Sequence, residues 1–251
     1  MHATPTSAPF SVALVLEPRG DETAATRTFD ATLGSSWTIG PKAHGGLLLA
    51  LCANAARQAF GGATPSMQPL AVSANYLSPP EPGPVQLTTT LRKRGRTVCL
   101  VDVELRQDGV SAVRATVTLG PPERGDAAFE RAHPMQDMPI APPSDAIDVS
   151  THVFGQIVHV ARVCELRVDP STGGFLRGEV EGDPVIRLWV KPRGEAPDAL
   201  FALMAGDVSP PVTLNLGRLG WAPTVQLTAL LRAEPAPGWL RVQMSTSKVG
   251  A

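Results

Sequence analysis

One acidic residue stands where it could do chemistry. Asp207 is the only acid between Asp198 and Glu234, and it follows seven apolar residues and a glycine. A carboxylate in apolar surroundings can act as a general base that takes a proton from water. A negative charge at the C-terminal end of a helix opposes the helix dipole, so helix stability does not account for it. The alternative, with equal weight from the residues alone, is an aspartate that caps the turn before Ser209.

A second set of candidates opens another apolar segment. His44, Gly45 and Gly46 precede a run rich in Ala and Leu that ends at Phe60. The first N–H groups of a helix have no intrahelical acceptor, and glycine allows a ligand to approach them closely. The two glycines could therefore bind a substrate oxygen, or they could simply allow the helix to pack against a sheet. His44 could bind substrate, although a histidine that caps the helix or lies in solvent is the more common arrangement.

Several other chemistries are not supported. The sequence has no Gly-x-Ser-x-Gly elbow, phosphate loop or dinucleotide fingerprint. His133, His152 and His159 do not form a metal-binding pattern, so we expect neither a metal nor a bound cofactor. The formal net charge of −1 and the lack of a large basic patch argue against a nucleic-acid partner.

The first half of the chain predicts a sheet wrapped around a helix. The segment 44–60 is apolar on nearly its whole circumference, which is typical of a buried helix. Residues 27–37, 85–91, 97–105 and 110–119 have strand character, and Asp108-Gly109 is typical of a tight hairpin turn. A buried helix followed by an antiparallel meander indicates an α+β fold.

The second half repeats this layout at an offset of 154 residues. A Pro-rich linker, 121–148, separates two predicted domains at 1–120 and 149–251. Strands are expected at 175–180 and 185–190, a helix from Pro197, and a strand over 223–231, which lies opposite 69–77. The first copy continues through two strands, 97–119, for which the second copy has no corresponding residues. We therefore expect a second sheet without its last strands, or one completed by another chain.

Cysteine content and length indicate the compartment. The chain has 251 residues, 43% of them hydrophobic, and three widely spaced cysteines, Cys52, Cys99 and Cys164. This pattern is typical of core thiols in a reducing cytoplasm. Met1 to Val12 lacks the features of a signal peptide, and no apolar run is long enough to span a membrane.

Several of these segments together resemble the acyl-CoA thioesterase II family. They are Trp37, Gly45-Gly46 with the following helix, 74–80, 91–96 and 103–109 in the first half, and Gly206-Asp207 and 223–225 in the second half. The resemblance covers roughly residues 10–249. It implies a double hotdog, in which two antiparallel sheets each wrap around a helix and active sites form where the two units meet.

The resemblance also implies roles for individual residues. Asp207 matches the catalytic aspartate of the family, and Thr224 matches the threonine that helps to orient the attacking water. The third member, a glutamine in the last strands of the second hotdog, has no counterpart in this sequence. Gln107 is its pseudo-equivalent in the first unit, either as a vestige or as a site residue.

Two functions follow from these observations. The first is hydrolysis of fatty acyl-CoA to a free fatty acid and coenzyme A by water activated by Asp207. The second is a non-hydrolytic hotdog protein that binds acyl thioesters or has a structural role. A hydratase is disfavoured, because hotdog hydratases pair an aspartate with a histidine on one helix segment. We expect acyl-CoA as the partner, no membrane span, and a homo-oligomer, because an incomplete sheet leaves an edge open for pairing.

Overall fold

A computed structural model describes residues 9–20, 25–61, 67–123, 125, 128–180, 182–220 and 222–250. Met1 to Ala8, which make up most of the segment without signal-peptide features, lie outside these ranges. None of the described helices is long and apolar enough to cross a membrane.

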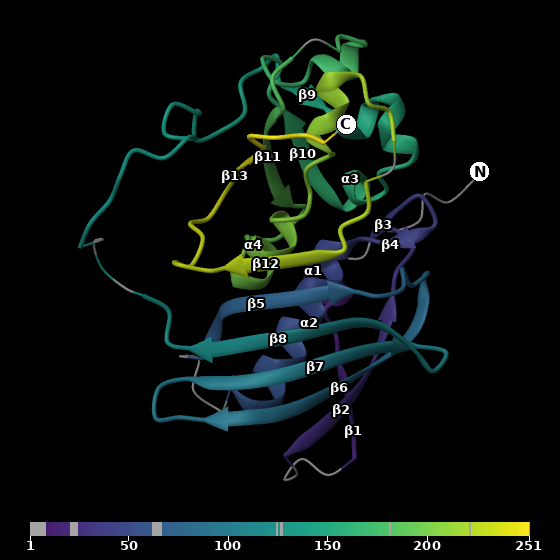
Figure 1. Cartoon of the computed structure of the whole chain (residues 1–251), viewed down its shortest axis with the longest axis vertical. Coiled ribbons are helices and arrows are strands. Elements are labelled where there is room, and N and C mark those ends of the chain that lie inside the picture. Colours follow the sequence, from purple (N-terminus) through teal and green to yellow (C-terminus); the bar gives the residue numbers. More distant parts are fainter. Residues whose placement is uncertain are drawn as a thin grey trace.

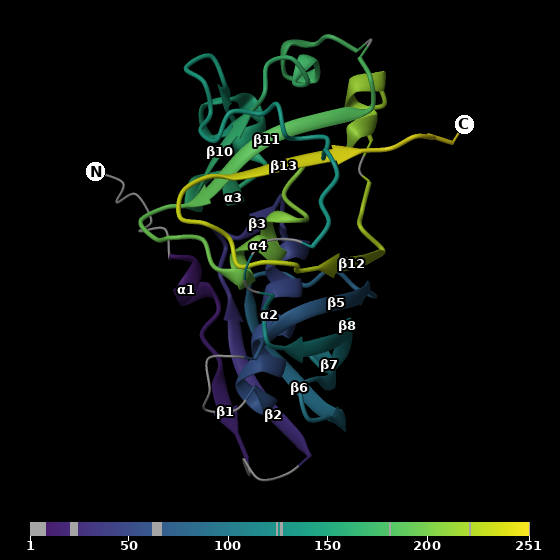
Figure 2. The same cartoon turned by 90° about the vertical axis from the view of Figure 1, so that its left-hand side faces the viewer.

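The first unit is a curved antiparallel sheet around one helix (Figures 1 and 2). Its elements are α1 (Phe10–Ala13), β1 (Glu17–Arg19), β2 (Thr26–Leu33), β3 (Thr38–Ile39), β4 (Lys42–Ala43), α2 (Gly45–Phe60), β5 (Gln68–Tyr76), β6 (Gly83–Arg94), β7 (Cys99–Gln107) and β8 (Val110–Gly120). The order in the sheet is β1-β2-β6-β7-β8-β5-β12, and its last strand comes from the second half of the chain. The prediction of an α+β fold is confirmed.

The composition and the two ends of the central helix α2 explain why it forms. Ala and Leu favour the helix, the buried His44 caps its start, and Gly61 caps its end. Both Leu47 and Leu51 are fully buried, as expected for a helix that is apolar all round. The predicted hairpin is also confirmed, since Asp108 and Gly109 both have positive φ values, 51° and 78°.

The second unit repeats the order strand, helix, strand, strand. It contains β9 (Ile147–Asp148), α3 (Val160–Val163), β10 (Cys164–Val168), β11 (Val185–Pro192), α4 (Ala199–Ala205), β12 (Gln226–Leu230), β13 (Leu240–Ser245) and four 3-10 helices, Val149–Thr151, Val153–Gln156, Gly174–Arg177 and Val212–Leu216. The strand expected over 175–180 is wrong: this segment contains a 3-10 helix that ends at Gly178, whose φ is 78°. The strand β10 was not predicted.

The two units join edge to edge. In the central pair β12 runs antiparallel to β5, with Leu227 opposite Ala74 and Ala229 opposite Val72. The hydroxyls of Ser73 and Thr228, which also face each other in this pair, are 2.9 Å apart. In the described part of the chain β12 pairs only with β5. The strand β13 lies at the edge of a second sheet, of order β13-β11-β10-β9, and among the described strands it pairs only with β11. The lack of counterparts to β7 and β8 stays a prediction.

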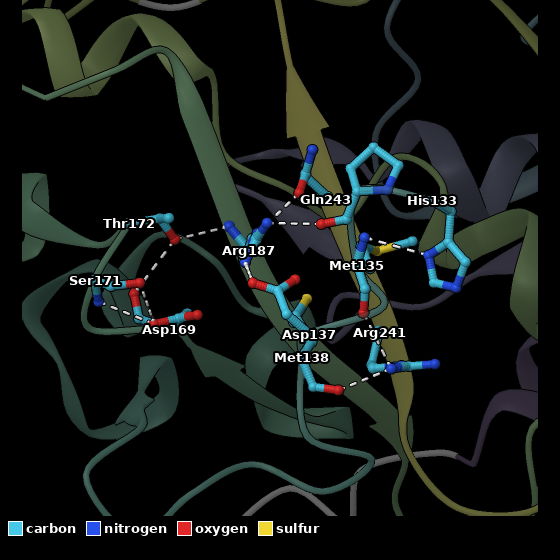
Figure 3. Close-up of polar contacts among 11 residues, drawn as sticks. His133, Met135, Asp137, Met138, Asp169, Ser171, Thr172, Arg187, Arg241 and Gln243 are labelled. Atoms are coloured by element: carbon cyan, nitrogen blue, oxygen red, sulfur yellow. Dashed lines mark hydrogen bonds and ion pairs between the residues drawn. The ribbon is translucent and has the colours of Figure 1, made fainter. Parts of the chain in front are cut away.

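The segment predicted as a linker has a packed part. Residues 133–139 lie across β11 and β13 and are fixed through backbone carbonyls (Figure 3). Arg187 donates to Pro134 O at 2.6 Å and pairs with Asp137, and Arg241 donates to Met135 O and Met138 O at 3.1 and 2.8 Å. Trp189 Nε1 donates to Pro139 O at 2.8 Å. We call residues 133–139 the strap, because they are fastened to the second sheet.

Candidate active site

Asp207 lies where the two units meet. It comes directly after α4 and its capping residue Gly206, and its side chain is half-buried. Its Oδ1 accepts a hydrogen bond of 3.1 Å from Thr224 Oγ1. Its Oδ2 is 2.5 Å from the point that a β-carbon on Gly45 would occupy. The carboxylate of the second unit therefore faces the start of the helix of the first unit.

The sequence brings Thr224 to this place through strand pairing. Thr224 lies two residues before β12 and is exposed. The carbonyl of the next residue, Val225, accepts a hydrogen bond of 2.9 Å from the backbone N–H of Tyr76 at the end of β5. The β5–β12 pair thus fixes the threonine beside Asp207. Both residues predicted to be catalytic are in direct contact.

Both glycines lie in close contact with the second unit. A β-carbon on Gly45 would collide with the Asp207 carboxylate, and one on Gly46 would collide with the backbone carbonyl of Met204 in α4. These contacts support the packing role that the sequence left open. The N–H groups of this first turn have no intrahelical acceptor, and the positive end of the α2 dipole favours negative charge in front of them. This position suits both a carboxylate and a developing oxyanion.

His44 is a buried cap that also holds Asp207. Its Nδ1 accepts from Leu47 N at 3.3 Å, so the ring proton is on Nε2, which donates to the backbone carbonyl of Asp207 at 3.1 Å. Burial lowers the pKa of His44, although the nearby Asp207 acts in the opposite direction. The imidazole is therefore neutral, and both of its nitrogens are engaged within the protein. This arrangement matches the capping alternative rather than the substrate-binding one.

Gln107 lies in a different network. Its amide accepts from Glu81 N and donates to Glu81 O, both at 2.9 Å, and thereby fixes the turn before β6. The neighbouring carbonyl of Pro80 accepts from Ala43 N at 2.9 Å, immediately before His44. Gln107 thus supports the segment that leads into α2, and its hydrogen bonds within the described ranges are to Glu81 and Pro84 rather than to Asp207.

Tyr76 is a residue of the site that was not predicted. Its hydroxyl donates to Gly45 O at 2.9 Å, and its ring lies 3.5 Å from the point where a Gly45 β-carbon would be. Burial, and then the charge of Asp207, raise the pKa of Tyr76 well above its usual value. The only signal in the sequence was that Tyr76 is the single tyrosine of the chain.

Among the described residues there is no cluster of three or more His, Cys, Asp or Glu that could hold a metal ion. A cavity of about 510 Å³ lies at the other end of α2, where Phe10, Leu14, Asn54, Arg57 and Leu200 form part of its lining. Asp207 is not among the residues that line this cavity, so the cavity is separate from the candidate site.

Comparison with known proteins assigns both halves of the chain. The acyl-CoA thioesterase N-terminal domain matches residues 33–120, and the acyl-CoA thioesterase C-terminal domain matches residues 133–251. An uncharacterised protein of Mycobacterium tuberculosis is 46% identical over 260 residues, which cover 96% of this chain and 88% of that protein.

Solved structures agree on the fold. A candidate thioesterase II of Thermobifida fusca superposes with a TM-score of 0.79 at 24% identity, covering 96% of this chain and 86% of its own. An acyl-CoA thioesterase II of Mycobacterium marinum gives a TM-score of 0.64 at 14% identity, covering 96% and 85%. A hotdog-fold protein of unknown function from Alicyclobacillus acidocaldarius gives 0.77 at 21% identity, covering 96% and 87%. With the two domain matches, these likenesses place the chain in the acyl-CoA thioesterase family, with a fold related to the double hotdog.

Proposed function

We propose that this protein hydrolyses fatty acyl-CoA to a fatty acid and coenzyme A, with Asp207 as general base. The observation that carries the proposal is the position of the Asp207 carboxylate between Thr224 and the first turn of α2. A base, a hydroxyl bonded to it and the backbone N–H groups of Gly45 and Gly46 at the start of α2 are thus close together. These are the groups that water-mediated acyl transfer requires.

The proposed reaction has two steps. Asp207 accepts a proton from water as the water oxygen attacks the thioester carbon, and the carbonyl oxygen becomes an oxyanion. The N–H groups at the start of α2 stabilise this oxyanion. The tetrahedral intermediate then collapses, the C–S bond breaks, and the thiolate of coenzyme A takes up the proton that Asp207 holds.

Thr224 and His44 have supporting roles in this mechanism. Because the Thr224 hydroxyl donates to Oδ1, Oδ2 is the oxygen that remains for the water. Because His44 donates to the backbone carbonyl of the same aspartate, it fixes the backbone position from which the Asp207 side chain extends. Gln107 supports the approach to α2 from a greater distance.

One observation favours the second candidate, a non-hydrolytic protein that binds acyl thioesters. Within the described ranges the Asp207 side chain has a single hydrogen-bond partner, Thr224, and that partner is exposed. A water held by one carboxylate and one hydroxyl is positioned less firmly than one held by three groups. Both candidate functions require binding of an acyl thioester, and only the first requires its hydrolysis.

The deciding experiment measures thiol release from acyl-CoAs of increasing chain length. The wild type, Asp207→Asn and the control Asp102→Asn are compared, since Asp102 is an exposed carboxylate in β7 paired with Arg92. We expect turnover to fall about 100-fold or more in Asp207→Asn, the scale for losing a general base, and to stay unchanged in the control. Binding of acyl-CoA without turnover in the wild type would establish the second candidate instead.

A further inference from the structure

Tyr76 is the residue that joins the separate parts of the candidate site. It is the last residue of β5, the strand that lies between β8 and β12. Its backbone N–H donates to Val225 O on one side, and its side chain reaches the start of α2 on the other. One residue is thus bonded to the segment that carries Thr224 and to the first residue of α2.

The side-chain contacts are specific. The hydroxyl donates to Gly45 O at 2.9 Å, and Cε1 and Cζ lie 3.5 Å from the point that a β-carbon of Gly45 would occupy. The Oδ2 atom of Asp207 is 2.5 Å from that same point. The ring and the carboxylate therefore share the space that is left open by the missing side chain of Gly45.

The phenol is held in its neutral form. Burial is the first cause of the raised pKa of Tyr76, and the negative charge of Asp207 adds to it. A phenol ordinarily loses its proton at about pH 10, so with its pKa raised further Tyr76 is protonated at neutral pH. The hydroxyl therefore has the proton that it donates to Gly45 O.

We infer that Tyr76 is a positioning residue for the reaction at Asp207. Its hydroxyl sets the first turn of α2, and its backbone sets Thr224, so the oxyanion donors and the base keep a fixed separation. This inference rests on the proposed function, because a positioning role has meaning only if the site turns over. Tyr76 does not exchange a proton with the substrate.

The test removes only the hydroxyl. Tyr76→Phe keeps the ring against Gly45, so the fold is retained, and we expect kcat to fall about tenfold while KM changes by less than about twofold. The control is Ser73→Ala, which removes another hydroxyl hydrogen bond of β5, the one with Thr228, and should leave both constants unchanged. A Tyr76→Phe enzyme with the wild-type kcat would overturn the inference.

A second measurement separates positioning from loss of folded protein. Because the chain has one tyrosine, incorporation of 3-fluorotyrosine gives a single ¹⁹F resonance that reports on this position alone. We expect Asp207→Asn and Thr224→Ala to shift that resonance, whereas Asp102→Asn should not. An unmoved resonance in all three variants would contradict the coupling of Tyr76 to the site. If the wild type shows no turnover while the resonance shifts as expected, the proposed function fails and the contacts of Tyr76 stand.

Discussion

The carboxylate of Asp207 occupies the space in which a side chain on Gly45 would begin, with Oδ2 2.5 Å from the β-carbon position. Gly46 has a different neighbour, the backbone carbonyl of Met204. We therefore predict different outcomes for alanine at the two positions. Gly45→Ala displaces a movable side chain, so the protein folds but loses most of its turnover. Gly46→Ala presses on backbone and lowers the free energy of unfolding by roughly 1–3 kcal/mol.

These two variants are compared by urea unfolding and by steady-state hydrolysis. The control is Gly34→Ala, where a β-carbon would lie 3.8 Å from Trp37 Cδ1, an ordinary van der Waals distance. A Gly45→Ala protein with full turnover would show that the contact between helix start and carboxylate is not required.

Thr224 is predicted to act through its hydroxyl. Thr224→Ala removes the hydrogen bond to Oδ1 and frees the carboxylate to rotate, so we expect kcat to fall about tenfold. Thr224→Ser keeps the hydroxyl and should retain most of the activity. The matched control is Thr228→Ala, an exposed threonine of the same strand region. Equal rates for the alanine and serine variants would rule out the hydroxyl as the important group.

His44 predicts a pH dependence of stability. Its folded pKa lies below the unfolded value of about 6.5, because burial favours the neutral ring. Below pH 6.5 the unfolded chain binds a proton that the folded chain does not, so stability falls as the pH decreases toward the folded pKa. His44→Asn keeps an acceptor at the helix cap but cannot titrate, and its Tm should decrease less between pH 7 and pH 5. His133→Asn, at an exposed position, serves as control, and an unchanged slope in His44→Asn would contradict the assignment.

The three cysteines are predicted to be unreactive in the folded protein. All are buried, and burial raises the pKa of both Cys52 and Cys164 to about 12. The thiolate is the reactive form, so iodoacetamide at pH 8 should label none of them until the chain is unfolded. Mass spectrometry before and after denaturation checks this. Labelling of Cys52 in the native state would show that the centre of α2 opens readily.

The strap is predicted to stabilise the second unit. Arg241→Met removes two hydrogen bonds to backbone carbonyls while keeping much of the side-chain volume, so we expect the free energy of unfolding to fall by about 1–3 kcal/mol. Limited proteolysis of residues 133–139 should also become faster. Arg94→Met, at an exposed position of β6, is the control. An unchanged free energy of unfolding would mean that water can replace Arg241 as the hydrogen-bond donor to these carbonyls.

The sequence predicted those features that depend on local patterns. The Ala and Leu content predicted α2, and Asp108-Gly109 predicted the hairpin because few other residues accept two positive φ values. Asp207 stood out as an isolated acid after an apolar run, the family resemblance supplied its role and that of Thr224, and the structure places the two in contact. Such features are encoded within a few residues of the chain.

The parts that were missed depend on contacts between distant residues. Tyr76 ends a strand like many aromatic residues, and its importance arises from the pairing of β5 with β12. The strap resembled a polar linker because its anchors are backbone carbonyls, which any sequence provides. A strand was expected where the 3-10 helix Gly174–Arg177 lies. Two adjacent apolar residues, Phe175 and Leu176, are too short a pattern to distinguish a strand from such a helix.

The strap also determines where the chain can be opened. Because residues 133–139 are bound to β11 and β13, they belong to the second unit. The chain that links the two units therefore ends before residue 133, and the exposed Arg131 lies in this link. A cleavage after Arg131 would give two fragments, each with its own sheet, that adhere through the ladder between β5 and β12. Neither fragment alone holds both Gly45 and Asp207. Reassembly of the two pieces could thus be followed simply as the return of turnover.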